Sequence, residues 1–381
     1  MKPPQLPEGN RVVVRAFAEE PMQAIEEQME LVSMPVPDVG SLGPDDVLIA
    51  VESASVGWVD LLMTSGQYQH MPQPPYTPGL EYAGRVSWKG AAVDDGRFRV
   101  GDAVFVDGFM AGPRSVGAYQ AYGGFASYAV APATAVHPLP PGFDFDQACN
   151  LLGNYETAYH CLVACGQLQP GETVLIHGAA GSTGLAAVHL AKLLGATVIA
   201  TGRSEEKLAI VKSQGADHVL SCRPDEGSTG VRRFRDDVKA LTGGAGVDVV
   251  YDGVGGDVTL ESLRCMKFGA RLLIVGWAST PNVARGKGQR GAPNANQLPT
   301  NLIMMKGLRV LGCPTVISTL RDPSIRIPRL EAIMRWVGAG QLRPYVSHRF
   351  PLSAFKEAMR AKWRGDVVGG CVLRPSAPPR P

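Results

Sequence analysis

The first 150 residues alternate short apolar runs with turns that are rich in proline and glycine. The runs lie at 11–17, 45–56, 82–88, 102–108 and 125–132. Short apolar segments bounded by turn residues predict β-strands. The first part of the chain is therefore expected to be β-rich.

The pattern changes near Asn150. The segment "ETVLIHGAAGSTGLAAVHLAKLLGATVIATGRSEEKLAIVKSQGADHVL" reads as strand, glycine turn, helix, strand, helix and strand. Strands are expected to follow at 246–255, 271–277 and 308–313, with helices at 231–241 and 258–268. Alternation of strands and helices predicts an α/β fold with a parallel, doubly wound sheet.

The C-terminal part returns to a mixed pattern. An amphipathic helix at 327–342, a strand at 345–350, a helix at 352–363 and a last strand at 369–375 are predicted. The final segment "SAPPRP" is expected to fray. No internal repeat is visible.

Composition narrows the class of protein. A chain of 381 residues suggests two domains, and 37 basic against 35 acidic residues gives no field that favours nucleic acid or a membrane surface. No secretory signal and no apolar run long enough to span a bilayer are visible. Seven cysteines without paired spacing fit a reducing cytoplasm better than a disulfide framework. The expected partner is a small-molecule substrate.

A glycine-rich turn follows the predicted strand at 173–177. It reads Gly178-Ala179-Ala180-Gly181-Ser182-Thr183-Gly184, so alanine replaces the first glycine of the G-x-G-x-x-G pattern. Gly181 would let the backbone approach a pyrophosphate, Gly184 would let the helix pack on the strand, and the helix N-terminus would supply N–H donors. The alternative is a glycine-rich turn that binds nothing.

The end of the next strand indicates which dinucleotide is bound. An NAD site places an acidic residue there for the ribose 2′-hydroxyl. This sequence has Arg203, Ser204 and Lys207 instead. Two cations and a hydroxyl suit a 2′-phosphate, so the cofactor is predicted to be NADPH. The alternative is that Arg203 and Lys207 are solvated charges at the start of a helix.

No metal site is expected. A catalytic zinc needs three protein ligands, yet the seven histidines are dispersed and neither H-E-x-x-H nor C-x-x-C occurs. Cys161 and Cys165 share a predicted helix face beside His160, which is more typical of buried structural cysteines than of a metal site.

Several long segments together resemble the medium-chain dehydrogenase/reductase superfamily, in its zinc-free quinone oxidoreductase branch. They are "VDLLMTSGQYQHMPQPPYTPGLEYAG", "LQPGETVLIHGAAGSTGLAAVHLAKLLGATVIAT", "GVDVVYDGVGG", "GARLLIVGWAS" and "LPTNLIMMKGLRVLG". The resemblance implies a GroES-like catalytic domain at 1–148 and 316–381 around a Rossmann NADP-binding domain at 149–315. It also implies a homodimer joined through the strand near 308–313.

The resemblance also assigns residues to the cofactor. The family's A-A-G-x-x-G turn matches Ala179 to Gly184, and its 2′-phosphate contacts match Arg203, Ser204 and Lys207. Arg223 is an additional candidate for the 2′-phosphate. The family's T-A-Y threonine near the nicotinamide matches Thr157, the asparagine of its P-x-N-L segment matches Asn301, and Gly276 is also assigned to the cofactor.

The sequence departs from the family at the nicotinamide end. The family's N-x-x-D-x-Y segment has Gly57 in place of its asparagine and Leu62 in place of its tyrosine, which leaves Asp60 and the later Tyr68 as catalytic candidates. Asp60 could instead be a structural cap, and Tyr68 a wall of the pocket. Zinc alcohol dehydrogenases have a metal-binding histidine between a glycine and a glutamate, where this chain has Leu80.

These features indicate the reaction class. Without a Lewis acid a plain ketone is hard to activate, whereas a conjugated acceptor spreads the charge that hydride transfer creates. The expected function is NADPH-dependent reduction of an electron-poor conjugated acceptor. Three alternatives stay open: a quinone, which is favoured, an enone or enoyl thioester, and a non-catalytic nucleotide-binding role. The basic segment 281–297 is expected to be a solvated loop or a lid over an anionic ligand.

Overall fold

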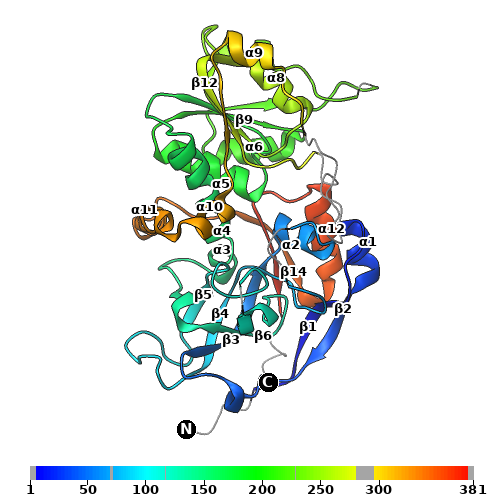
Figure 1. The fold of residues 1–381 in the computed structure, drawn as a ribbon, viewed down its shortest axis with the longest axis vertical. Coiled ribbons are helices and arrows are strands. Elements are labelled where there is room, and N and C mark those ends of the chain that lie inside the picture. Colours follow the sequence, from blue (N-terminus) through cyan, green and yellow to red (C-terminus); the bar gives the residue numbers. More distant parts are fainter. Residues whose placement is uncertain (1–5, 69–71, 116, 228, 280–295, 376–381) are drawn as a thin grey trace. The chain divides into compact units, whose positions relative to one another are not determined.

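The structure is a computed structural model that describes residues 6–68, 72–115, 117–227, 229–279 and 296–375. It divides into two compact units (Figure 1). The first contains the described residues up to Gly153 and from Arg343 onward, and the second contains those from Asn154 to Leu342. The predicted domain boundaries lie at 148/149 and 315/316, whereas the contacts divide the described chain at 153/154 and 342/343. The helices at 315–338 group with the second unit.

The first unit is built on a seven-stranded sheet. Its order is β14-β15-β3-β4-β5-β7, and β6 pairs with β3. The strands are β3 (Asp46–Ser55), β4 (Tyr82–Lys89), β5 (Ala103–Val106), β6 (Tyr128–Pro132), β7 (Val136–Pro138), β14 (Val346–Pro351) and β15 (Gly370–Arg374). A separate antiparallel pair is formed by β1 (Gly9–Val14) and β2 (Met29–Met34). The β-rich reading of the first part of the chain is confirmed.

Four α-helices accompany this sheet. They are α1 (Pro21–Gln23), α2 (Trp58–Thr64), α3 (Phe145–Ala148) and α12 (Phe355–Arg364). Trp58 on α2 stacks on Trp363 of α12, with ring centroids 5.3 Å apart and an interplanar angle of 4°. The stack fixes α2, the helix that carries Asp60, to the C-terminal helix of the same unit.

The second unit has a six-stranded sheet in the order β10-β9-β8-β11-β12-β13. All five strand pairs are parallel. The strands are β8 (Thr173–Ile176), β9 (Thr197–Gly202), β10 (His218–Ser221), β11 (Val247–Asp252), β12 (Met266–Ile274) and β13 (Arg309–Gly312). This is the predicted parallel, doubly wound sheet, and the α/β fold class is confirmed.

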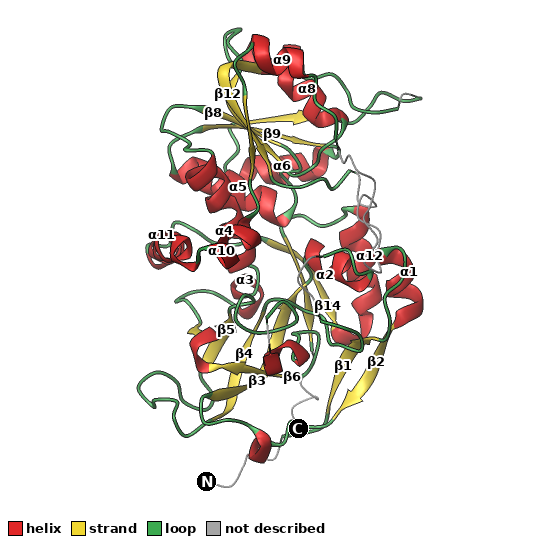
Figure 2. Cartoon of the chain, viewed as in Figure 1, coloured by secondary structure: helices red, strands yellow, loops and turns green. Residues whose placement is uncertain are grey.

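The second unit also contains helices, most of which connect these strands (Figure 2). They are α4 (Leu152–Tyr159), α5 (Ser182–Leu193), α6 (Glu205–Ser213), α7 (Arg235–Leu241), α8 (Asp257–Cys265), α9 (Thr300–Met305), α10 (Thr315–Arg321) and α11 (Arg326–Gly338). A π-helical segment, η5 (His160–Cys165), continues α4. No helix among the described residues is long and apolar enough to cross a membrane.

Element ends are where the sequence reading was wrong. The helix predicted at 231–241 begins at Arg235, and the helix predicted at 258–268 ends at Cys265. Met266 begins β12 because it pairs with Val247 of β11. Cys265 and Met266 are both buried, and the sequence pattern places both in the helix. The pairing of Met266 with Val247 instead ends the helix at Cys265 and begins the strand at Met266.

Candidate active site

The turn after β8 has the geometry of a phosphate cradle. Gly178 adopts a φ of 60°, and a Cβ added to Gly184 would lie 2.3 Å from the Gly178 carbonyl oxygen. Only glycine therefore lets α5 begin so close to the turn. Gly181 is the N-cap of α5 and has no side chain to bond the first N–H groups of this twelve-residue helix. A pyrophosphate accepts such N–H groups and is favoured by the helix dipole.

Helix α4 is tied to this turn. Thr183 donates a hydrogen bond from Oγ1 to Oδ1 of Asn154, over 3.2 Å. Thr157 lies three residues after Asn154 on the same helix, and residues at that spacing share a helix face. Thr157 therefore lies one helical turn after the residue that Thr183 contacts. Asn154 was missed because its only sequence signal is its place one turn before Thr157.

The carboxyl ends of β9 and β10 bring the predicted 2′-phosphate residues together. Strand pairing sets Gly202 opposite Ser221, so Arg203 and Arg223 follow neighbouring strand ends. Both arginines are exposed, and neither forms an ion pair with a carboxylate among the described residues. Two uncompensated guanidinium groups at one sheet end suit a dianionic phosphate.

Ser204 and Lys207 lie beside these arginines. Ser204 is the N-cap of α6, and its hydroxyl oxygen accepts a hydrogen bond from the backbone N–H of Lys207 at 3.4 Å. The cap sets the direction of the helix whose first turn carries Lys207. Arg203 also acts on Cys222: burial raises the pKa of that thiol, and the Arg203 charge opposes the rise.

His177 lies between β8 and the glycine turn that begins at Gly178, and no signal in the sequence pointed to its role. Its ring is buried, with Nδ1 2.7 Å from Oγ1 of Thr201 and Nε2 2.6 Å from Oγ of Ser262. Ser262 already donates to the Val258 carbonyl, so it accepts from Nε2–H, and Thr201 donates to Nδ1. Burial lowers the pKa of His177 to about 4. A neutral imidazole therefore joins β8, β9 and α8 directly beneath Gly178.

The predicted Gly276 lies at the end of β12. Its N–H donates to the Asp252 carbonyl at 3.2 Å, and a Cβ there would lie 3.3 Å from the Gly253 carbonyl oxygen. The Asp252 carboxylate organises the neighbouring turn by accepting from the N–H groups of Val254 and Gly255, each at 2.9 Å. Gly276 is thus at the carboxyl edge of the sheet, the edge at which ligands bind in such folds.

Asn301 lies near the start of α9. It is exposed on the short helix α9, and the carbonyl of Lys306, just after that helix, accepts from the N–H of Gly269 at 2.8 Å. Gly269 belongs to the amino-terminal half of β12, whereas the phosphate turn follows the carboxyl end of β8. The contact between Lys306 and Gly269 fixes the end of α9 that lies away from Asn301, and the cofactor role of Asn301 stays a prediction.

In the first unit, the Asp60 carboxylate accepts hydrogen bonds from three backbone N–H groups. Its Oδ2 accepts from the N–H of Gly57 at 2.8 Å, and its Oδ1 accepts from Gly79 and Leu80 at 3.2 and 3.1 Å. The side chain is buried, which raises its pKa to about 6 even though the three N–H bonds lower it. Both oxygens are engaged, so this geometry corresponds to the structural-cap alternative for Asp60.

The residues around Leu80 do not offer a set of metal ligands. Leu80 itself is buried and apolar, and Oε1 of Glu81 accepts from the N–H of Gly153 at 2.7 Å. No group of three histidine, cysteine or carboxylate side chains that could hold a metal ion is found among the described residues.

Tyr68 is the last described residue before position 69, and most of the basic loop lies outside the described residues. Tyr68 is half-buried after α2, and no described residue forms a hydrogen bond with its hydroxyl. The loop predicted at 281–297 lies outside the described residues, apart from its last two positions.

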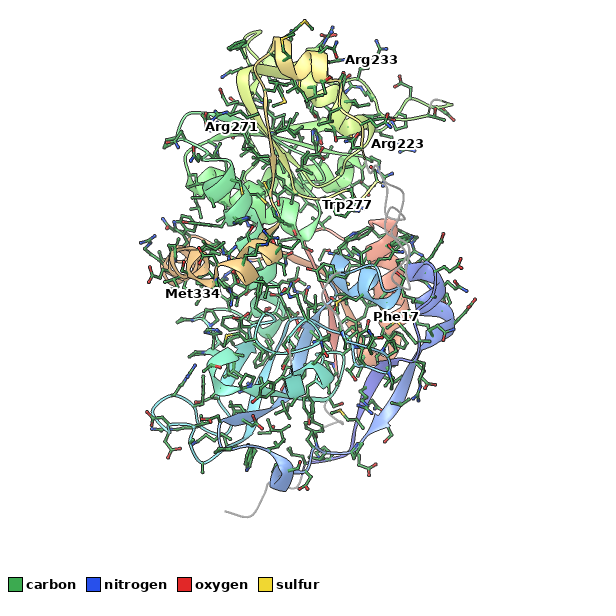
Figure 3. All side chains as sticks on the ribbon, viewed as in Figure 1. Phe17, Arg223, Arg233, Arg271, Trp277 and Met334 are labelled. Atoms are coloured by element: carbon green, nitrogen blue, oxygen red, sulfur yellow. The ribbon has the colours of Figure 1, made fainter. Side chains whose placement is uncertain are left out.

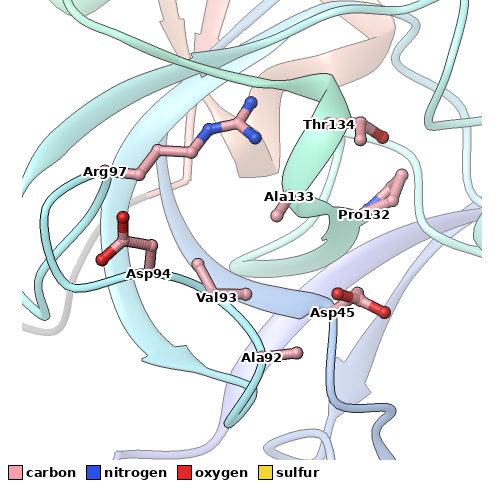
Figure 4. Close-up of a pocket in the computed structure, with 8 residues that line it drawn as sticks. All are labelled: Asp45, Ala92, Val93, Asp94, Arg97, Pro132, Ala133 and Thr134. Carbon is pink, nitrogen blue, oxygen red and sulfur yellow. The ribbon is translucent and has the colours of Figure 1, made fainter.

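A small depression of about 210 Å³ lies elsewhere in the first unit (Figure 4). It is lined by Asp45, Ala92, Val93, Asp94, Arg97, Pro132, Ala133 and Thr134. None of these residues is a predicted site residue, and its three charged side chains are all exposed. The depression belongs to the first unit, whereas the cofactor turn belongs to the second.

Comparison with known proteins identifies the family. A family model described as "Alcohol dehydrogenase GroES-like domain" matches residues 43–141, and one described as "Zinc-binding dehydrogenase" matches 182–323. A quinone oxidoreductase-like protein 2 homolog from Nematostella vectensis is 32% identical over 334 residues, which cover 86% of this chain and 82% of that protein. The chain belongs to the medium-chain dehydrogenase/reductase superfamily, in its quinone oxidoreductase-like branch.

Solved structures agree with this family. A probable oxidoreductase from Mycobacterium abscessus is 30% identical with a TM-score of 0.74, covering 97% of this chain and 100% of that one. A mycobacterial protein solved in complex with NADPH is 26% identical with a TM-score of 0.74, covering 96% and 100%. The predicted family and its oxidoreductase class are confirmed, and the comparisons support NADPH as the cofactor.

Proposed function

We propose that this medium-chain reductase uses NADPH to reduce an electron-poor conjugated acceptor, with a quinone as the leading class. The observation that carries the proposal is the residue set around Leu80. A buried leucine occupies the position between glycine and glutamate, and Glu81 is bonded to the main chain. This donor set supplies no Lewis acid to a ketone oxygen, so the acceptor has to disperse the developing charge itself.

The second unit has the features that NADPH requires. The glycine cradle and the N-terminus of α5 would receive the pyrophosphate through Ala180, Gly181 and Ser182. Arg203, Lys207 and Arg223 would hold the 2′-phosphate at the ends of β9 and β10. When bound, NADPH supplies the hydride. Thr157, on the helix that the Asn154–Thr183 bond ties to the phosphate turn, would orient the nicotinamide end.

A substrate panel tests this function. NADPH oxidation at 340 nm would be measured with benzoquinones and naphthoquinones, acyclic enones, enoyl thioesters and unconjugated ketones. We expect turnover with conjugated acceptors, quinones fastest, and none with the ketones. Faster turnover with enoyl thioesters would transfer the assignment to that class. Tight NADPH binding without turnover of any acceptor would favour a nucleotide-binding role and contradict the proposal.

We also propose that the protein is a cytoplasmic homodimer. The proposal is supported by seven free cysteines and by an apolar surface at the outer edge of the six-stranded sheet. Val310 on the edge strand β13 is exposed, as are Phe268, Met304 and Met305 next to it. Edge strands with exposed apolar side chains commonly pair with a second chain. Light scattering of the purified protein, and of a Met304→Lys variant, would measure the mass.

A further inference from the structure

Trp277 is an exposed indole on a rigid support. Its side chain is 46% exposed, just beyond the end of β12. All five tryptophans lie among the described residues, and the other four are partly covered. Trp58 and Trp363 stack on each other, and Trp336 packs against Tyr159. Figure 3 labels Trp277 on the second unit.

The backbone around Trp277 is fixed on both sides. Val275 and Gly276 donate to the Asp252 carbonyl at 2.8 and 3.2 Å. Ala278 donates to the Gly253 carbonyl at 3.2 Å, and Ser279 donates to that of Val254 at 2.9 Å. Residues 275–279 therefore continue the pairing of β12 along the turn that follows β11. An aromatic side chain on such a support loses little entropy on binding a ligand.

Gly255 packs beside Trp277 in a backbone conformation that favours glycine. It has a φ of 78°, and a Cβ added there would lie 3.5 Å from the Cβ of Trp277. The turn thus passes close to the backbone of Trp277. The Asp252 carboxylate, which accepts the N–H of Gly255, fixes the turn in this position.

The order of the strands locates Trp277 relative to the cofactor. The phosphate turn follows β8, the 2′-phosphate residues follow β9 and β10, and β11 and β12 lie on the opposite side of β8. A dinucleotide that spans a doubly wound sheet directs its two halves to the two sides of the phosphate turn. The nicotinamide, and the acceptor that meets it, therefore belong on the side of Trp277.

We propose that Trp277 is a stacking platform that selects planar, ring-containing acceptors, such as bicyclic quinones, over acyclic enones. The proposal rests on the proposed reductase function and adds the shape of the acceptor to it. Aromatic rings in offset stacking gain affinity beyond the area that they bury. An acyclic enone has no ring face to offer and gains little from the indole.

The test compares Trp277→Ala and Trp277→Phe with the native protein, using 2-methyl-1,4-naphthoquinone and an acyclic enone. We expect Trp277→Ala to raise the KM for the naphthoquinone about three- to tenfold. Trp277→Phe should fall in between, and the KM for the enone and the Kd for NADPH should stay within about twofold. Leu241→Ala, which removes a 40% exposed apolar side chain at the end of α7 in the same unit, is the control. Equal changes for both acceptors, or none, would overturn the proposal.

A second measurement does not depend on turnover. Naphthoquinone titrated into the NADP⁺-loaded protein should quench tryptophan fluorescence, and Trp277→Phe should lose most of that quenching. If the native protein reduces no acceptor but shows this Trp277-dependent quenching, the reductase proposal fails and the platform stands. If it reduces quinones without Trp277-dependent quenching or a KM effect, the platform fails and the function stands.

Discussion

The carboxylate of Asp60 accepts the backbone N–H of Leu80 at 3.1 Å, although the two residues are twenty positions apart. The same oxygen accepts the N–H of Gly79, and the other oxygen accepts that of Gly57. One buried side chain thus fixes both the start of α2 and the segment that carries a leucine where zinc enzymes have a histidine. Asp60 is in this sense a positioning residue for the segment that contains Leu80.

Asp60→Asn should destabilise the protein. An amide has one accepting oxygen, so at least one of the three N–H groups would lose its partner. Loss of a hydrogen bond to a charged group costs about 1.5–3 kcal/mol. The free energy of unfolding in urea would measure this cost. Asp38→Asn, at an exposed cap that accepts from Gly40, is the control and should cost less than about 1 kcal/mol. An Asp60→Asn protein of native stability with an activity loss above a hundredfold would instead make Asp60 catalytic.

Metal removal should leave the activity intact. The described residues contain no three-ligand group, and the position of the zinc-binding histidine holds Leu80. Prolonged dialysis against EDTA followed by an assay with NADPH and a quinone should recover nearly full turnover. Elemental analysis should find well under one zinc per chain. A stoichiometric zinc lost together with activity would overturn the argument about the acceptor as well.

Arg203→Ala should weaken NADPH selectively. The exposed guanidinium has no carboxylate partner among the described residues, so its removal leaves no buried charge behind. A charged hydrogen bond of about 1.5–3 kcal/mol corresponds to roughly ten- to a hundredfold in Kd. The Kd for NADH should barely change. Arg264→Ala removes the same charge from α8, where it pairs with Glu261, and should affect neither cofactor. Equal weakening of NADPH and NADH would exclude a 2′-phosphate contact.

The parallel sheet and the phosphate turn could be predicted because their signals are local. Strand, turn and helix follow within a few residues around Gly181, and the absence of an acidic residue at Arg203 is read directly from one strand end. The position of Arg223 beside Arg203 depends on the pairing of Gly202 with Ser221, which the sequence does not specify. The family resemblance pointed to Arg223, and the strand register explains why Arg223 follows the strand end next to that of Arg203.

The rest of the site depends on contacts between distant segments. Asp60 resembles any first-turn acidic residue until its bonds to Gly79 and Leu80 are seen. Asn301 matched a family motif, and the contact of Lys306 with Gly269 fixes only the far end of α9, so its role stays a prediction. His177 had no motif at all, because its partners come from β9 and α8.

Tyr68→Phe should separate a proton donor from a wall residue. The substitution keeps the ring and removes a hydroxyl that no described residue bonds. If this hydroxyl protonates the reduced acceptor, kcat should fall about 10²–10⁴-fold with an unchanged Kd for NADPH. Near-native turnover with every acceptor would show that the proton comes from water or from elsewhere, and that Tyr68 only shapes the pocket.

Stability should fall in acid through His177. The imidazole is held neutral between Thr201 and Ser262, and burial lowers its pKa from 6.5 to about 4. Between these two values the unfolded chain binds a proton that the native state does not, so stability is fully present above pH 6.5 and is lost as the pH falls toward 4. The loss for this group is on the order of 3 kcal/mol.

The variant His177→Gln isolates this contribution. Glutamine can still bridge two hydroxyl groups but does not titrate, so the variant should be less stable at pH 7 and should lose less stability on acidification. Asp60 acts in the opposite direction, because its raised pKa of about 6 makes the native state favour its protonated form between about pH 4 and 6. The difference between native and variant unfolding free energies at each pH removes this second effect. A difference that stays constant from pH 7 to 4.5 would show that His177 does not titrate as its burial requires.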